Sequence, residues 1–120
     1  MPQVKYTQTK GLHQVSATGS RVLLGDGDSP AVTFAAGAGT ISGNDVCGIV
    51  TVATQGTSGN AITITFSKAY AVKPVVTLNY YDLANVADSG VTVSKTAITI
   101  TPTGNTGTGE IHYQVFGISN

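Results

Sequence analysis

Hydrophobic and polar residues alternate with a period of two through most of the last two-thirds of the chain. Within residues 61–66 the side chains of Ile62, Ile64 and Phe66 share one face, and the threonines between them share the other. The same alternation recurs, with some breaks, in residues 47–54, 75–80, 96–101 and 110–116. Helix signals are nearly absent, so the pattern predicts short β-strands.

Segments rich in glycine and small polar residues separate the predicted strands. Residues 55–60 and 103–109 contain residues that tolerate left-handed backbone, and we expect each of these loops to join neighbouring antiparallel strands. Residues 91–93 and 97–101 predict a hairpin that turns near Ser94. Several short strands at this spacing are typical of a sandwich or a barrel.

The sequence predicts an all-β fold: a single antiparallel, jelly-roll-like β-sandwich over residues 37–120, with an extended N-terminal arm over residues 1–36. Residues 6–11 have no apolar face, which favours the arm. Within it, residues 21–24 and 31–34 are each able to pair as a short strand, with their own domain or with a neighbouring subunit. The arm is therefore predicted to serve attachment or subunit exchange.

Composition indicates one domain with an uncharged polar surface. The chain has 120 residues, and a domain of this size buries roughly two-thirds of the surface of its unfolded chain. Hydrophobic residues make up 41% and charged residues only 10%, against a usual charged share of about 25%. A mean hydropathy of +0.16 and a net charge of +0 argue against disorder of the whole chain.

Charge and hydropathy argue against two classes of partner, nucleic acids and membranes. Charged residues are scattered singly, so no basic stripe is present to neutralise a row of phosphates, and we predict no nucleic-acid binding. The apolar stretches are shorter than the roughly 20 residues of a membrane span, and the polar start predicts no signal peptide. The sequence thus predicts no membrane partner.

Few residues carry recognisable chemistry. Cys47 is the only cysteine, which excludes an intrachain disulfide, and we expect it to be a small buried side chain in a strand. An Asp-Gly-Asp run at residues 26–28 is interpreted as a turn rather than a calcium loop. His13 and His112 lack zinc-ligand or catalytic spacing, and alternation with Tyr113 places His112 on an exposed or interfacial face. We predict no catalytic residue, no metal and no cofactor.

Sugar hydrolysis would need two carboxyl groups about 5 to 9 Å apart. In the regular part of the chain the carboxylates are Asp45, Asp82, Asp88 and Glu110. Nothing in their spacing places two of them together. Asp45 is explained by an Asx-type turn that enters the strand at Cys47. The sequence therefore predicts that the protein is not an enzyme.

Tyrosines gather around the strand that begins at Val75. Tyr70 precedes this strand, whereas Tyr80 and Tyr81 close it. Tyrosine rings stack on sugars and anchor protein interfaces, so the loop that begins at Tyr81 is a candidate binding loop. The candidate ligand or interface residues are Tyr80, Tyr81, Asp82 and Asn85. The alternative is that these rings seal the ends of the sandwich or pack at a subunit contact.

Three runs of sequence resemble a small domain that recurs at the C-terminal ends of phage tail-fibre and head-fibre or decoration proteins. Residues 41–52 are similar to the family's Gly-Thr-Asp, then Gly, then alternating strand, with Asn44 in place of the usual threonine. Residues 62–76 are similar to its pattern of Phe, Ala, an aromatic residue and then Pro-Val-Val. Residues 111–117 resemble its closing strand of Tyr-x-Val-x-Gly type.

The resemblance covers about the last two-thirds of the chain and implies a virion location and a homotrimer. Cys47, an unpaired thiol, fits assembly in the reducing cytoplasm of a host cell. After Leu78 such domains often continue with Pro-Ala-Asn, whereas this chain has Asn79 followed by two tyrosines. No ligand role of that loop therefore carries over from the family.

Two functions follow for the chain. The first is a bacteriophage virion structural protein, a capsid-surface decoration, cement or knob module that assembles with itself and with capsid or other virion proteins. Length favours it, because 120 residues with their own Met1 leave no room for a fibre shaft. The alternative is a tail-fibre tip adhesin that binds host-surface glycan through loops such as residues 80–85 or 103–109. A hydrolase is a third hypothesis, with the least support.

Overall fold

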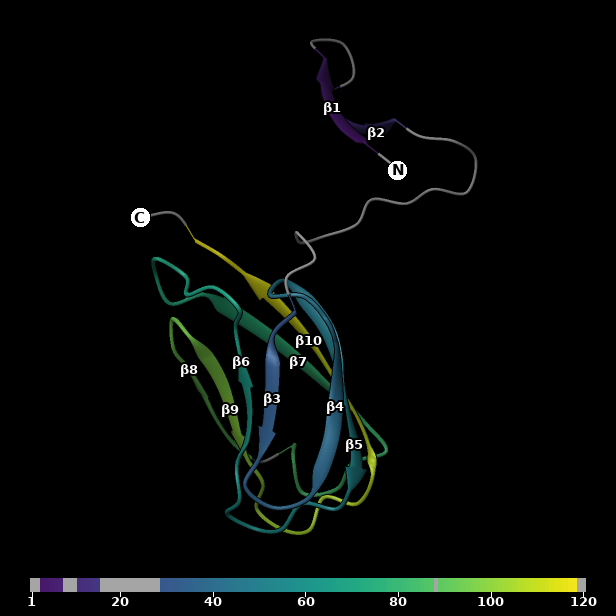
Figure 1. The fold of residues 1–120 in the computed structure, drawn as a ribbon, viewed down its shortest axis with the longest axis vertical. Coiled ribbons are helices and arrows are strands. Elements are labelled where there is room, and N and C mark those ends of the chain that lie inside the picture. The colour runs from purple at the N-terminus through teal and green to yellow at the C-terminus, as the bar shows by residue number, and fades with distance from the viewer. Residues whose placement is uncertain (1–2, 8–10, 16–28, 88, 119–120) are drawn as a thin grey trace.

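The computed structural model describes residues 3–7, 11–15, 29–87 and 89–118, the first two segments as backbone alone (Figure 1). The regular secondary structure of these residues consists of β-strands. They include no helix that is long and apolar enough to cross a membrane. The strands are β1 (Gln3–Thr7), β2 (Gly11–Val15), β3 (Ala31–Phe34), β4 (Ala38–Gly43), β5 (Cys47–Thr54), β6 (Ile62–Thr65), β7 (Val75–Tyr81), β8 (Gly90–Val93), β9 (Ala97–Thr101) and β10 (Gly109–Phe116).

Strands β3 to β10 form two four-stranded sheets. The first sheet has the strand order β4-β5-β10-β7 and the second has the order β3-β6-β9-β8. Every pairing within them is antiparallel. The sheets pack face to face on a shared core, as the two layers in Figure 1 show. The prediction of an all-β fold built from antiparallel sheets is confirmed.

The two longest predicted loops connect different sheets. Residues 55–60 lead from β5 in the first sheet to β6 in the second, and residues 103–109 lead from β9 in the second to β10 in the first. The prediction that each loop joins neighbouring strands was wrong. The physical reason is that β5 pairs with β10 and β6 pairs with β9, so the hydrogen-bonded neighbours are distant in sequence.

The predicted hairpin of β8 and β9 is confirmed. The two strands pair from Gly90 with Thr101 to Val93 with Ile98. In the turn, the Ser94 side-chain oxygen accepts hydrogen bonds from the backbone N–H groups of Thr96 at 3.2 Å and Ala97 at 3.0 Å. Serine at this position therefore satisfies two turn donors, as its frequency in turns leads one to expect.

The core lies between the sheets and takes alternate residues from their central strands. Its buried members are Val50, Val52, Ile62, Ile64, Phe66, Ile98, Ile100, Ile111, Tyr113 and Val115. The face predicted for Ile62, Ile64 and Phe66 is therefore confirmed. Full burial of one valine or isoleucine contributes about 1.5–3 kcal/mol. Apolar burial thus holds the two layers together.

Strand β3 belongs to the second sheet although it lies in the segment predicted as an arm. It pairs with β6 from Ala31 with Thr65 to Phe34 with Ile62, and Phe34 packs against the core. Nearer the N-terminus, β1 and β2 pair as an antiparallel hairpin. The predicted strand at residues 21–24 and the turn at residues 26–28 lie outside the described residues.

The turn between β4 and β5 is closed by Asn44. Its side-chain Oδ1 accepts hydrogen bonds from the backbone N–H groups of Val46 at 2.8 Å and Cys47 at 3.0 Å. The prediction that assigned this turn to Asp45 was wrong by one residue, because the neighbouring asparagine supplies the Asx oxygen. Asp45 is left to point out of the turn.

The Asp45 carboxylate links the first sheet to the second. It accepts hydrogen bonds from the Ser67 N–H at 2.7 Å, the Ser67 hydroxyl at 2.6 Å and the Lys68 N–H at 2.9 Å, in the segment that follows β6. We call these three bonds the Asp45 bridge. Bonds to an ionised acceptor are stronger than bonds between neutral groups, so the bridge adds a directional contact between the two sheets.

Two tyrosine hydroxyls reinforce the same turn. Tyr70 donates to the Asp45 carbonyl at 2.8 Å, and Tyr113 on β10 donates to the Asn44 carbonyl at 2.7 Å. Tyr113 reaches the turn across Gly48, where a Cβ would collide with its hydroxyl. Burial, and then the charge of Asp45, raises the pKa of Tyr70; burial also raises the pKa of Tyr113. Both hydroxyls therefore stay protonated to higher pH than a free tyrosine.

Replacement of the bridging carboxylate tests its contribution to stability. Asp45→Asn leaves a single oxygen for three donors, and we expect the free energy of unfolding to fall by about 1–3 kcal/mol in urea titration. Asp82→Asn is the matched control, since it removes a carboxylate from an exposed position and should change that free energy by less than about 0.5 kcal/mol. Equal losses in both variants would contradict the bridge.

Alkaline pH tests the tyrosine hydrogen bonds. The folded-state pKa of each ring is raised above its usual 10.0, so its contribution is fully present below that pH and is lost as pH rises above it. We expect urea titrations between about pH 8 and about pH 11.5 to show falling stability, and Tyr113→Phe to reduce that fall. An unchanged pH slope in Tyr113→Phe would show that this ring does not carry the effect.

Candidate binding face

The outer side of the first sheet carries aromatic, acidic, amide, hydroxyl and thiol side chains. Strand alternation turns the residues on either side of buried Tyr113 and Ile111 outward on β10, and register places partners from β5 and β7 beside them. His112 lies between Ile49 and Asn79. We call the following set the outer face: Cys47, Ile49, Thr51, Thr77, Asn79, Tyr81, Glu110, His112 and Gln114.

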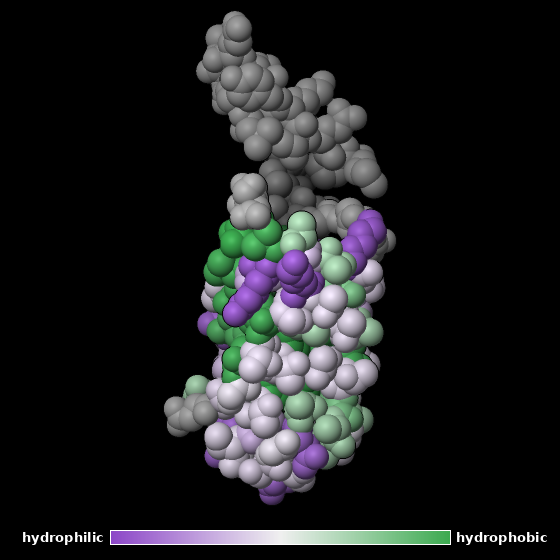
Figure 2. Space-filling view, turned by 90° about the vertical axis from the view of Figure 1, so that its left-hand side faces the viewer, coloured by the Kyte–Doolittle hydropathy of each residue, from purple (hydrophilic) through white to green (hydrophobic). Residues whose placement is uncertain are grey.

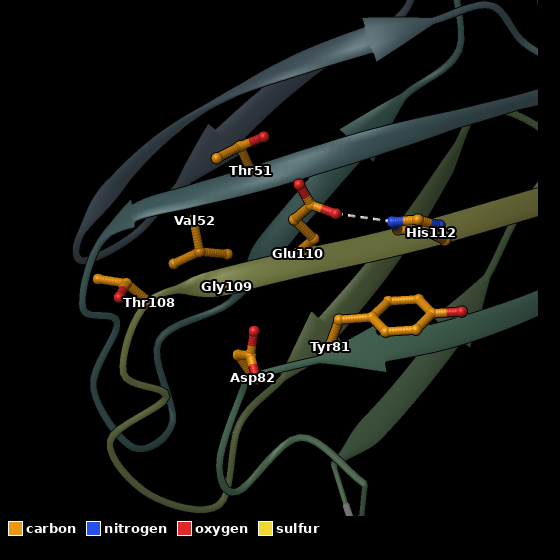
Figure 3. Close-up of a pocket in the computed structure, with 8 residues that line it drawn as sticks. All are labelled: Thr51, Val52, Tyr81, Asp82, Thr108, Gly109, Glu110 and His112. Carbon is orange, nitrogen blue, oxygen red and sulfur yellow. Dashed lines mark hydrogen bonds and ion pairs between the residues drawn. The ribbon is translucent and has the colours of Figure 1, made fainter.

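A hollow of about 620 Å³ opens at one end of the outer face. Figure 3 shows its walls, which come from β5, from the start of β10 and from the end of β7. The lining residues are Thr51, Val52, Tyr81, Asp82, Thr108, Gly109, Glu110 and His112. Strands supply most of these residues, which gives the hollow a rigid floor.

Three side chains in this hollow contact one another. The ring centroids of Tyr81 and His112 lie 4.4 Å apart with an interplanar angle of 50°. The His112 Nε2 lies 2.8 Å from the Glu110 Oε2, the contact drawn as a dashed line in Figure 3. The side chains of His112 and Glu110 are 36% and 47% exposed, so the pair contributes at most about 1 kcal/mol to stability. Its main effect is to hold the imidazole beside the Tyr81 ring.

Asp82 follows β7 with an unusual backbone. Its φ is 58°, in the left-handed region that aspartate and asparagine tolerate better than most residues, and Asn85 has a φ of 56°. The bend ends the strand immediately after Tyr81. The Asp82 side chain lines the hollow beside Glu110, whose strand neighbour is Tyr81.

A second hollow of about 330 Å³ lies further along the same face. It is lined by Cys47, Gly48, Ile49, Thr77, Asn79, His112, Tyr113 and Gln114. His112 therefore borders both hollows. Cys47 is half-buried on this face, which corrects the prediction of a buried core cysteine, because Gly48 holds the inward position next to it.

The structure brings together half of the residues predicted for the binding loop. Tyr81 and Asp82 line the first hollow, with Tyr81 half exposed. Tyr80 instead turns inward and packs against the core, and the Asn85 side chain donates to the Asn105 carbonyl at 2.7 Å. Tyr80 thus contacts the core rather than the hollow, and Asn85 bonds one loop to another.

Sequence reasoning missed the residues that β10 contributes. It placed His112 on an exposed face, which is confirmed, but found no pair of carboxylates, whereas Asp82 and Glu110 line one hollow. The reason is the pairing of β7 with β10, which sets Glu110 opposite Tyr81 across a long stretch of sequence. The sequence signal for these residues was alternation: Glu110 and His112 are separated by an odd number of positions from Tyr113, so they face away from the core if Tyr113 faces into it.

Among the described side chains, no group of three histidine, cysteine, aspartate or glutamate residues is placed to hold a metal ion. Comparisons with models of protein families, with curated proteins and with solved structures found no match to this chain.

Proposed function

We propose that this chain is a non-enzymatic structural protein of a bacteriophage virion, a module displayed on the capsid surface as a decoration, cement or knob. The observation that supports it is that the three resembling runs meet at one turn. Asn44 and Asp45 belong to the first run, Ser67 to the second and Tyr113 to the third, and hydrogen bonds join them. The residues that carry the resemblance therefore form one structural unit.

Exposed apolar side chains support assembly with further copies or with other virion proteins. Val75 and Phe116 face each other across β7 and β10 and are 54% and 51% exposed, and nearby in sequence Ile118 is 49% exposed. In the view of Figure 2, hydrophobic residues gather in the upper part of the two-sheet domain. Apolar groups that stay in water in one chain are typical of surfaces buried in an assembly.

The finer description of the fold, a jelly-roll-like sandwich, is also a proposal. Five of the seven connections between β3 and β10 pass from one sheet to the other, and only the β4–β5 and β8–β9 hairpins stay within a sheet. Frequent crossing between two antiparallel sheets is typical of Greek-key and jelly-roll sandwiches. Strand order is thus the support for this description.

Removal of the N-terminal segment tests capsid attachment. Because β3 is part of the second sheet, the deletion should end before Ala31, and removal of residues 2–28 keeps every strand of both sheets. We expect the shortened protein to fold with an unchanged thermal midpoint and to lose co-sedimentation with capsids that lack it. Capsid binding equal to that of the full chain would contradict attachment through this segment.

Oligomeric state tests the proposed homotrimer. The chain has a mass of 12.2 kDa. For a homotrimer, analytical ultracentrifugation should give three times that mass. The apparent stability of an obligate trimer rises with protein concentration, because dissociation accompanies unfolding. A monomer whose thermal midpoint is independent of concentration would contradict the trimer.

A second candidate function is a tail-fibre tip adhesin that binds host-surface glycan. The observation that favours it is the half-exposed Tyr81 ring, which lines a hollow together with His112. The same hollow contains Asp82 and Glu110, so hydrolysis has to be tested as well. Release of reducing sugar from a bound polysaccharide, abolished in Glu110→Gln, would overturn the non-enzymatic part of the proposal.

A further inference from the structure

We propose that the outer face of the first sheet is a binding site for an uncharged oligosaccharide, with the exposed ring of Tyr81, in tilted contact with His112, as the platform for one sugar ring. The inference rests on the second candidate function, glycan binding. It places the site on strands β5, β7 and β10 rather than on the loops that the sequence predicted. It does not depend on attachment to a capsid. Four observations carry it.

The first observation is the exposed aromatic platform. Tyr81 is 50% exposed, yet its ring is held at 4.4 Å from His112, which Glu110 holds in turn at 2.8 Å. A tyrosine ring offers a large amphipathic contact area and loses little conformational freedom on binding. The apolar C–H face of a pyranose ring matches such a surface.

The second observation is the set of polar atoms around the platform. Asp82 and Glu110 contribute carboxylates, which accept hydrogen bonds, and Thr51 and Thr108 contribute hydroxyls, which donate and accept. Sugar hydroxyls supply the matching donors. Hydrogen bonds to ionised acceptors are stronger than those between neutral groups, so the two carboxylates orient a sugar that the ring alone would bind without direction.

The third observation is the charge of the lining. The eight residues of the first hollow include two carboxylates, and neither lysine nor arginine is among them. The second hollow is lined by uncharged residues and His112. A sialic acid, a uronic acid or a phosphorylated sugar would place a like charge beside Asp82 and Glu110. The charge of the face therefore selects uncharged sugars.

The fourth observation is the length of the face. His112 borders both hollows, so they lie next to each other along β10 between Glu110 and Gln114. Four residues of strand span about 13 Å, which is longer than one sugar ring. Amide and hydroxyl groups of Asn79, Thr77 and Gln114 line the second hollow. The site therefore fits an oligosaccharide rather than a single sugar.

The test uses the full chain on an array of neutral oligosaccharides built from glucose, galactose, mannose and N-acetylglucosamine. Matched glycans that carry sialic acid, uronic acid or phosphate are printed beside them. We expect saturable binding to one or more neutral oligosaccharides and weaker binding to their charged counterparts. Calorimetric titration with the best neutral oligosaccharide then measures the variants.

Tyr81→Ala should weaken that affinity by about tenfold or more, because truncation of a central aromatic contact typically has this size of effect. Tyr81→Phe keeps the ring and should retain most of the affinity, whereas Glu110→Gln should weaken it. Val91→Ala is the control, since Val91 is an exposed apolar residue on β8, in the second sheet, and lines neither hollow. It should change the affinity by less than about twofold.

Three results would overturn the inference: no binding to any neutral oligosaccharide, tighter binding to the charged glycans, or an equal loss in Val91→Ala and Tyr81→Ala. Co-sedimentation with capsids is measured on the same variants. Intact capsid binding without sugar binding overturns this inference alone. Sugar binding without capsid binding supports it and overturns the capsid role instead.

Discussion

The two sheets meet through an apolar core and through the Asp45 bridge, which adds directional bonds at one turn. Apolar burial between the sheets is strong but has no direction, so it does not fix how one sheet lies over the other. The three bonds from the Asp45 carboxylate to Ser67 and Lys68 supply that direction. The Tyr113 hydroxyl adds a bond from β10 to the same turn, across 69 positions of sequence.

Which residues form the outer face depends on which residues of the same strands face the core. A shift of one residue in a strand moves every side chain to the other side of the sheet. The Tyr113 ring is buried on the inner side, where its hydroxyl reaches Asn44 across Gly48. His112 and Glu110 are then outward, and the pairing with β7 sets Tyr81 and Asn79 beside them. The position of the proposed sugar site thus follows from the same alternation that buries Tyr113 in the core.

Local patterns of the sequence were sufficient for much of the fold. Alternation identified the buried face of β6, and the serine at position 94 marked the β8–β9 turn. Neighbours within a sheet were not predictable in the same way, because β5 with β10 and β7 with β10 pair over long separations. Loops at residues 55–60 and 103–109 were therefore recognised as loops but assigned the wrong connections. The long-range pairing of β7 with β10 also explains why the sequence did not predict that Asp82 and Glu110 line one hollow.

The central claim is that Tyr113 and His112 lie on opposite sides of the first sheet, with the Tyr81 ring in contact with His112 on the outer side. Nuclear Overhauser contacts between aromatic ring protons measure this directly in the full chain. The account predicts strong cross-peaks between Tyr81 and His112, and cross-peaks from Tyr113 to the α-protons of Gly48. Cross-peaks between the Tyr113 and Tyr81 rings, without any between Tyr81 and His112, would contradict it.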